Sequence, residues 1–171
     1  MHTLKNSMKK AYLLGLLWVW PFLISAQTAE RNKNMSTNSV ENAVQFRIAR
    51  PTNQLDKIKT FYTQALGMRI LGSFTGHSGY SGVMLGMPNG QYHLEFTQHD
   101  EQKELPPPTK ENLLVLYFDT PEKYKAANKR IQALGIRPIE PENPYWEGKS
   151  KTYEDPDSWR IVLFNGVYRT D

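Results

Sequence analysis

Apolar residues between positions 45 and 97 change their spacing along the chain, and the change predicts a mixed α and β unit. Residues 45–48 alternate polar and apolar, the period of a half-buried strand. A helix is predicted next, with Asn53 as its N-cap and Gly67 ending it. Its apolar residues are Leu55, Ile58, Phe61, Tyr62 and Ala65. Residues 68–74, 82–85 and 92–97 then form short strands, so the predicted order is βαβββ.

The chain beyond position 110 predicts the same order. Residues 113–118 form the opening strand, where Tyr117 shares the phase of Leu113 and is expected to face the helix. Thr120 caps the following helix, and Gly135 ends it. Shorter strands are expected at residues 137–140, 152–154 and 160–164, with a turn at 155–157.

Two sequence matches indicate that the second unit is a copy of the first. Residues 64–69 (QALGMR) recur as residues 132–137 (QALGIR), 68 positions later. Residues 92–97 correspond to residues 159–164 at nearly the same offset. Because two separate segments agree on one period, an internal duplication is predicted.

The N-terminal segment has the order of a secretory signal. Lysines precede an uncharged apolar run at residues 11–24, and small residues follow before Gln27. We expect a signal peptide at residues 1–26, cleavage after Ala26, and a periplasmic or extracellular protein. An uncleaved anchor is the alternative, because Trp18 and Trp20 suit a membrane interface.

The remaining boundaries follow from composition. Residues 27–42 are expected to form a flexible leader, and residues 43–168 a single domain. Within it, unit one spans 43–100 and unit two spans 110–168, joined by a proline-rich connector at 101–109.

Charge and cysteine content narrow the function classes. The 171 residues carry a formal charge of +4, but loss of Lys5, Lys9 and Lys10 with the signal would leave +1. The folded part therefore gives no reason to expect nucleic acid, and no membrane partner is expected after cleavage. The chain has no cysteine, which excludes disulfides, thiolate metal sites and cysteine nucleophiles.

A four-stranded sheet covered by one helix leaves its other face open. We therefore expect an α+β fold in which the two open faces enclose one cup-shaped, barrel-like cleft. One chain carries both units, so a monomer can complete the cleft, and a homodimer is the alternative.

Three motifs resemble the vicinal oxygen chelate superfamily, which contains glyoxalase I, extradiol dioxygenases and bleomycin and fosfomycin resistance proteins. They are residues 55–62 (LDKIKTFY), 65–69 (ALGMR) and 154–163 (EDPDSWRIVL). The resemblance covers residues 43–167 and is nearest to small bacterial members of unassigned activity. It implies the fold but no particular reaction.

The resemblance also implies a metal ligand on the first and last strand of each unit, and this chain departs from that pattern. Glu95 matches one ligand position, but the other three hold Arg47, Asn112 and Val162. Glu111 adjoins Asn112, but a shift of one residue would turn it to the other sheet face. The usual four-ligand site is therefore not expected, and no cofactor is favoured.

Strand phase places the remaining candidates. Because Leu94 and Phe96 are expected under the helix, His93 and Glu95 should point into the cup, together with Arg47 from the first strand. An Arg47–Glu95 pair would then replace the metal cation and offer guanidinium donors to a ligand. A buried ion pair without any ligand is the alternative.

The alternative hypothesis is a metal site with a different set of ligands. His77, His93, His99 and Glu95 would hold zinc, nickel, manganese or iron, provided that the loop histidines converge on the strand. Glu95 is the candidate general base with or without metal.

Four further residues are expected to contact a ligand: Asn112, Tyr145, Trp146 and Arg160. Tyr145 and Trp146 suit a rim for stacking a planar molecule, and Arg160 should point inward beside Val162. The residues leave three functions open: an exported protein that binds a small planar or acidic molecule, a metal-dependent lyase, isomerase or dioxygenase, and an interaction module whose cup is filled by its own side chains.

Overall fold

The computed structural model describes residues 43–87, 90 and 92–169, and its compact body begins at Gln45. The predicted signal peptide at 1–26 and the leader at 27–42 lie outside the described residues. Among the described helices, none combines the length and the apolar character that crossing a bilayer requires.

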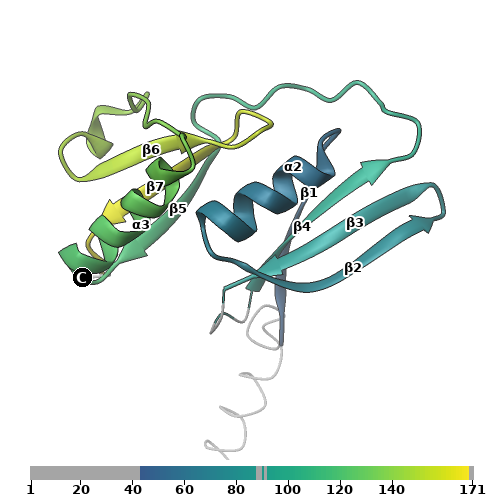
Figure 1. Ribbon diagram of the computed structural model, residues 1–171, viewed down its shortest axis with the longest axis horizontal. Coiled ribbons are helices and arrows are strands. Elements are labelled where there is room, and N and C mark those ends of the chain that lie inside the picture. Colours follow the sequence, from purple (N-terminus) through teal and green to yellow (C-terminus); the bar gives the residue numbers. More distant parts are fainter. Residues whose placement is uncertain (1–42, 88–89, 91, 170–171) are drawn as a thin grey trace, which may run out of the picture. The chain divides into compact units, whose positions relative to one another are not determined.

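Unit one contains a four-stranded sheet. Strand β1 (Phe46–Pro51) leads to helix α2 (Leu55–Thr60), which continues as a π-helical turn, η1 (Phe61–Ala65). Strands β2 (Arg69–His77), β3 (Tyr80–Gly86) and β4 (Tyr92–His99) follow. The spatial order is β1-β4-β3-β2, with β1 parallel to β4 and the other pairs antiparallel (Figure 1). The predicted βαβββ order of unit one is confirmed.

Unit two contains a three-stranded sheet. Strand β5 (Leu113–Phe118) precedes helix α3 (Pro121–Ala133), the 3-10 turn η2 (Pro144–Trp146), and strands β6 (Ser150–Glu154) and β7 (Arg160–Asn165). The order is β5-β7-β6, with β5 parallel to β7. Between α3 and η2, the strand expected at 137–140 is reduced to a bridge between Ile139 and Thr152. Pro138 and Pro141 flank that bridge and cannot donate to a ladder.

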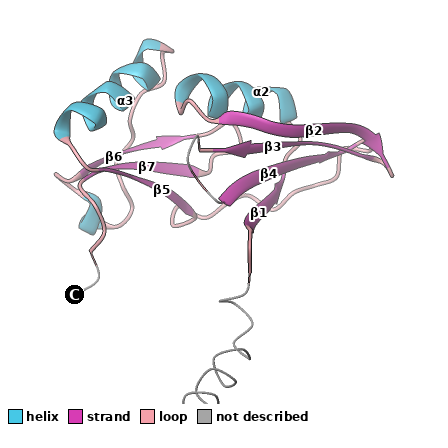
Figure 2. Cartoon of the chain, turned by 90° about the horizontal axis from the view of Figure 1, so that it is seen from below, coloured by secondary structure: helices cyan, strands magenta, loops and turns pink. Residues whose placement is uncertain are grey.

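One hydrophobic core joins the two units. Its buried side chains come mainly from α2, η1, β3 and β4 of unit one and from α3, β6 and β7 of unit two. Both helices lie on the same side of the sheets (Figure 2), so each sheet keeps an open face on the side away from the helices. The expected α+β fold is confirmed.

The sheets are not closed on each other within the chain. Of the principal cavities lined by described residues, none takes residues from both open faces. The helix-side faces share one core, and the open faces of both sheets lie on the side away from the helices.

A buried polar cluster also links the units. Arg50 donates to Asp155 at 2.6 Å, and the Tyr62 hydroxyl donates to the same carboxylate at 2.9 Å. The Arg50 guanidinium lies over the rings of Phe96 and Trp159, with centroids at 4.8 and 4.6 Å. Burial, followed by the charge of Asp155, raises the pKa of Tyr62 well above its ordinary value. The 155–157 turn is therefore anchored to β1 and η1.

Local predictions had mixed outcomes. Thr120 caps α3 by accepting from the Lys123 amide, and Gly67 and Gly135 end their helices at φ +75° and +78°. The N-cap predicted at Asn53 is wrong, because α2 begins after Gln54 and the Asn53 amide donates to the Lys103 carbonyl at 2.8 Å.

Candidate functional site

The parallel pairing of β1 with β4 assembles the first group of candidate residues. Arg47 is paired with His93, and Ala49 with Glu95, in the register of the two strands. Leu94 and Phe96 lie between and beyond these β4 residues and are buried in the helix-side core. The period of two therefore turns His93 and Glu95 to the open face, as expected.

Arg47, His93 and Glu95 form a connected set that we call the Arg47 cluster. Arg47 Nε donates to His93 Nε2 at 2.8 Å, and Arg47 Nη1 donates to Glu95 Oε2 at 2.9 Å. The Gln45 amide lies 3.4 Å from the other ring nitrogen of His93. His93 is 5 % exposed and the Glu95 side chain 12 %, whereas half of the Arg47 side chain is accessible to solvent. The ion pair expected from strand phase is present.

The Arg47 cluster does not fit the metal centre that the resemblance implies. Three of the four ligand positions that the resemblance implies hold Arg47, Asn112 and Val162, so among them only Glu95 could bind a cation, and its Oε2 atom already accepts from Arg47. The guanidinium charge also repels a cation at short range. Among the described residues, no three histidine, aspartate or glutamate side chains are grouped as a metal site would require.

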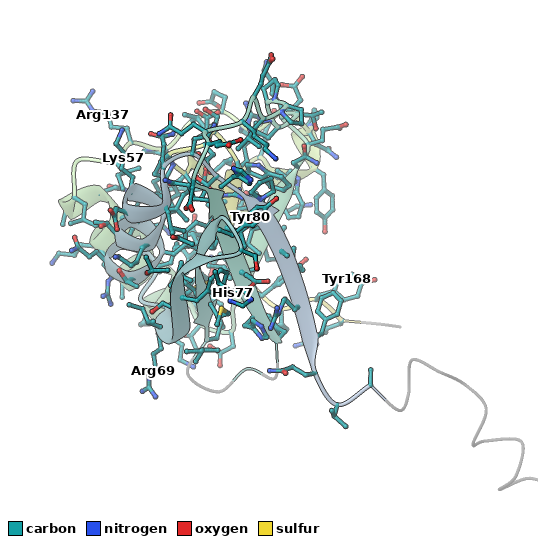
Figure 3. The ribbon with its side chains drawn as sticks, turned by 90° about the vertical axis from the view of Figure 1, so that its right-hand side faces the viewer. Lys57, Arg69, His77, Tyr80, Arg137 and Tyr168 are labelled. Carbon is teal, nitrogen blue, oxygen red and sulfur yellow. The ribbon has the colours of Figure 1, made fainter. Side chains whose placement is uncertain are left out.

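The histidines of the alternative metal site lie near the other end of the sheet. His77 ends β2 and pairs with Tyr80 across the hairpin (Figure 3). His99 packs edge-on against Tyr80 with ring centroids 4.6 Å apart, and its Nδ1 accepts from the Glu101 amide. His93 is six residues from His99 along β4, or about 20 Å. The structure therefore does not bring His77 and His99 to the Arg47 cluster.

The open face of unit two holds a separate cavity of about 210 Å³, which we call the Arg160 cavity. Its floor and apolar walls are formed by strands β5, β6 and β7 and by η2. The residues used below are Glu111, Leu113, Trp146, Thr152, Arg160 and Val162. Arg160 and Val162 share this face, as the sequence predicted.

Two expected ligand contacts lie at or near this cavity. Trp146 forms part of the wall, while Tyr145 is 55 % exposed and packs edge-on against Trp146 at 4.9 Å. Lys149 lies over the outer Tyr145 ring at 4.2 Å. The predicted aromatic rim is therefore half present, with Trp146 inside and Tyr145 outside.

Asn112 lies outside the cavity lining, and Glu111 takes that place. The Asn112 side chain accepts from the Thr109 amide at 2.7 Å and closes a turn before β5. The expectation that Tyr117 faces the helix is wrong, because it is 43 % exposed and packs on Phe164. All six residues of β5 are apolar, so the sequence does not show which of them face the helix and which face the open side. The position of Glu111, just before this strand, could therefore not be predicted.

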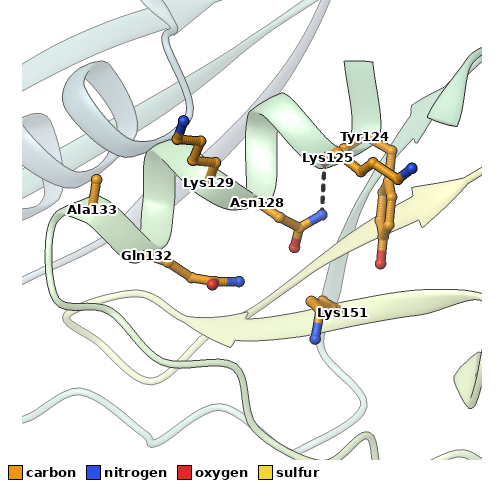
Figure 4. Close-up of a pocket in the computed structure, with 7 residues that line it drawn as sticks. All are labelled: Tyr124, Lys125, Asn128, Lys129, Gln132, Ala133 and Lys151. Carbon is orange, nitrogen blue, oxygen red and sulfur yellow. Dashed lines mark hydrogen bonds between the residues drawn. The ribbon is translucent and has the colours of Figure 1, made fainter. Parts of the chain in front are cut away.

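A second depression, of about 390 Å³, lies between α3 and β6 (Figure 4). Three lysines line it, but the polar groups beneath them bond to one another. Asn128 donates to the Tyr124 carbonyl at 2.8 Å and accepts from the Tyr153 hydroxyl at 2.7 Å. Because Asn128 is already paired, this depression is a weaker ligand candidate than the Arg160 cavity.

Comparison with known proteins identifies relatives of both units. Residues 46–97 match the YycE-like N-terminal domain, and residues 111–165 match the YycE-like C-terminal domain. The uncharacterized protein YycE of Bacillus subtilis is 46 % identical over 123 residues, which cover 72 % of this chain and 88 % of that protein.

Solved structures share the fold. A crystal structure of a YycE protein of unknown function from Bacillus subtilis, provisionally grouped with glyoxalase and fosfomycin resistance proteins, matches with TM-score 0.73 and 43 % identity. The aligned region covers 78 % of this chain and 97 % of the Bacillus subtilis chain. Leishmania major glyoxalase I has TM-score 0.57 at 20 % identity, covering 72 % and 87 %. TnmS3, an antibiotic binding protein from Streptomyces sp. CB03234, has TM-score 0.55 at 22 % identity, covering 73 % and 97 %.

Proposed function

Because this chain belongs to the YycE-like family of vicinal oxygen chelate proteins, we propose that it binds a small planar or acidic molecule on its open sheet faces without the four-ligand metal centre. The observation that carries this proposal is the pair of bonds from Arg47 to His93 and Glu95. By the resemblance, Arg47 stands at a position where enzymes of the superfamily carry a metal ligand.

The Arg47 guanidinium can serve a ligand as well as its two partners. It carries five N–H donors, and its bonds to His93 and Glu95 use two of them. Half of the side chain is exposed, so an acceptor oxygen of a ligand can approach it from solvent. The bonds to the strand hold the guanidinium in place before a ligand arrives, which lowers the entropy cost of binding.

The fold itself does not decide between binding and catalysis. It is shared by a glyoxalase I and by an antibiotic binding protein, and both likenesses are too distant to carry a function to this chain. The choice rests on the side chains of this protein.

A metal-dependent lyase, isomerase or dioxygenase is the second candidate. One observation favours it: His93 and Glu95 are two residues apart on one face of β4, so both could contact the same ion if Arg47 moved away. In that case Glu95 would be a metal ligand, and a general base would have to come from elsewhere.

Metal analysis separates the two candidates. The full chain, purified without a histidine tag, is incubated with zinc, nickel, manganese or iron(II), desalted and analysed for bound metal. We expect no stoichiometric ion in the wild type or in Arg47→Met. Arg47→Met frees the ring nitrogen of His93 and the carboxylate of Glu95 from the guanidinium. These two side chains alone are too few ligands for tight metal binding.

A stoichiometric ion in the wild type that is lost in Glu95→Ala, but retained in the exposed control Glu101→Ala, would establish the metal-dependent alternative. Binding itself is tested by a thermal-shift screen of small carboxylic acids. Under our proposal at least one acid raises the melting temperature of the wild type, and Arg47→Met reduces that rise.

Export and ancestry complete the proposal. We propose that residues 1–26 direct export and are removed, and that both units derive from one duplicated βαβββ unit. The mass of the protein recovered outside the cytoplasm tests export, because cleavage after Ala26 leaves Gln27 as the N-terminal residue.

A further inference from the structure

A buried arginine without sufficient partners lies in the Arg160 cavity. Arg160 is only 6 % exposed, and its Nε and Nη1 atoms are buried with no hydrogen-bond partner among the described residues. Glu154 forms an ion pair with Arg160, but its Oε1 atom lies 3.7 Å from Nε, which is beyond hydrogen-bond distance. A buried guanidinium in this state is energetically costly, so the cavity favours any acceptor that enters it.

A second unpaired group faces the same space. The Thr152 side chain is 1 % exposed, and its hydroxyl also lacks a partner among the described residues. Thr152 pairs with Val162 in the β6–β7 register, and Val162 is two residues from Arg160 on the same face of β7. The guanidinium and the hydroxyl thus offer donors to one site from neighbouring strands.

The charges around the cavity favour an anionic group at its floor. Glu142 at the rim pairs with Lys110 at 3.2 Å, which offsets both charges. Glu111 is exposed and therefore solvated, and the Glu154 side chain is 41 % exposed. Arg160 is the only buried charged residue among the described residues that line the cavity.

The walls select the rest of the ligand. Leu113 and Val162 supply apolar side chains, and Trp146 supplies an aromatic ring whose position is fixed by edge-on packing against Phe164 at 6.0 Å. A volume of about 210 Å³ accommodates one six-membered ring with a short acidic substituent.

We propose that the Arg160 cavity binds a small aromatic carboxylate. The carboxylate oxygens accept hydrogen bonds from the Arg160 guanidinium and the Thr152 hydroxyl, while the ring packs against Trp146. This site lies on the open face of unit two, apart from the Arg47 cluster, and it rests on the function proposed above, because it names the ligand class that this open face binds.

Calorimetric titration of the full chain tests the proposal, with benzoate as the probe and benzamide as a neutral molecule of the same shape. We expect benzoate to saturate one site per chain and benzamide to bind at least about tenfold more weakly, because only a carboxylate gains the charge-assisted bond. Arg160→Met should weaken benzoate binding by about tenfold or more. Thr152→Val should weaken it severalfold with the fold intact.

The matched control is Arg137→Met, which removes an exposed arginine (Figure 3) and should leave benzoate binding unchanged. Any of the following results would overturn the proposal: no benzoate binding up to about 10 mM, weaker than the range that a specific site is expected to reach; equal binding of benzamide; or binding that survives Arg160→Met and Thr152→Val. Loss of binding in Arg47→Met alone would place benzoate at the Arg47 cluster and would also overturn it.

Discussion

At the scale of single residues, the two arginines on the open faces differ in how well they are paired. Arg47 is half exposed and bonds to two side chains, whereas Arg160 is buried and two of its nitrogens bond to none of the described residues. Sequence phase predicted that both would point to the open faces. It did not predict this difference, because the partners of a side chain depend on residues from other strands.

Thr152 allows a stability test of its unpaired hydroxyl. Replacing it with valine removes a buried oxygen that has no partner among the described residues and keeps the shape of the side chain, so the free energy of unfolding should rise by about 1 kcal/mol. Urea denaturation at pH 7 measures the change.

The same substitution at Thr63 serves as the control. The Thr63 hydroxyl donates to the Lys59 carbonyl at 2.7 Å, so Thr63→Val should not stabilise the protein. A fall in stability for Thr152→Val would mean that its hydroxyl is paired in solution. Since Thr152→Val is also expected to weaken benzoate binding, a gain in stability together with a loss of affinity is the pattern expected of a binding group.

At the scale of secondary-structure elements, local signals were reliable where one residue alone performs the task. Thr120 with Pro121 begins α3, and the glycines end both helices, because these effects depend on backbone angles and one short hydrogen bond. Asn53 was misassigned because its amide finds a more distant partner, the Lys103 carbonyl in the connector.

Capping energies can be compared directly at these two positions. Thr120→Ala should lower the free energy of unfolding by about 1 kcal/mol, because the Lys123 amide loses its acceptor. Asn53→Ala removes only an exposed bond to the connector and should cost less than about 0.5 kcal/mol. If urea denaturation gave the same loss in free energy of unfolding for Asn53→Ala as for Thr120→Ala, Asn53 would have to act as a helix cap after all.

Strand phase was readable only where polar and apolar residues alternate. Polar and apolar residues alternate along strand β4, and the sequence correctly predicted that His93 and Glu95 point to the open face. Strand β5 is apolar throughout, so the side of Tyr117 and the place of Glu111 at the cavity could not be read from it.

At the scale of the whole molecule, the cluster of Arg50, Tyr62 and Asp155 links unit one to unit two. Asp155 is 93 residues from Tyr62 and 105 residues from Arg50 in the sequence, so no local sequence pattern predicts these two hydrogen bonds. The cluster sets a pH dependence, because Tyr62 is held protonated by burial and by the charge of Asp155.

Stability should therefore fall above pH 10. The pKa of Tyr62 is raised in the folded chain, while the unfolded chain releases this proton near the ordinary value of 10.0. Above that pH the folded state binds more protons than the unfolded state, so the free energy of unfolding decreases as pH rises. One such group contributes a slope of at most about 1.4 kcal/mol per pH unit.

Urea denaturation of the wild type and Tyr62→Phe between pH 8 and pH 11 measures this contribution. The variant should be less stable at pH 8, because the bond to Asp155 is lost, and the difference should narrow above pH 10. Tyr124 and Tyr153, whose pKa values are also raised by burial, account for the slope that the variant retains. Parallel curves for the two proteins would contradict the assignment.

Much of this protein can be read from its residues in order. Helical spacing, strand alternation and turn residues predicted the α+β units and their order. Strand alternation also predicted that Arg47, Glu95 and Arg160 point to the open faces of the sheets. Whether the open faces close on each other, and which of these charges is left unpaired, depends on packing between residues far apart in the chain. Free energies of burial and hydrogen bonding are properties of those contacts, and the contacts exist only once the chain is folded.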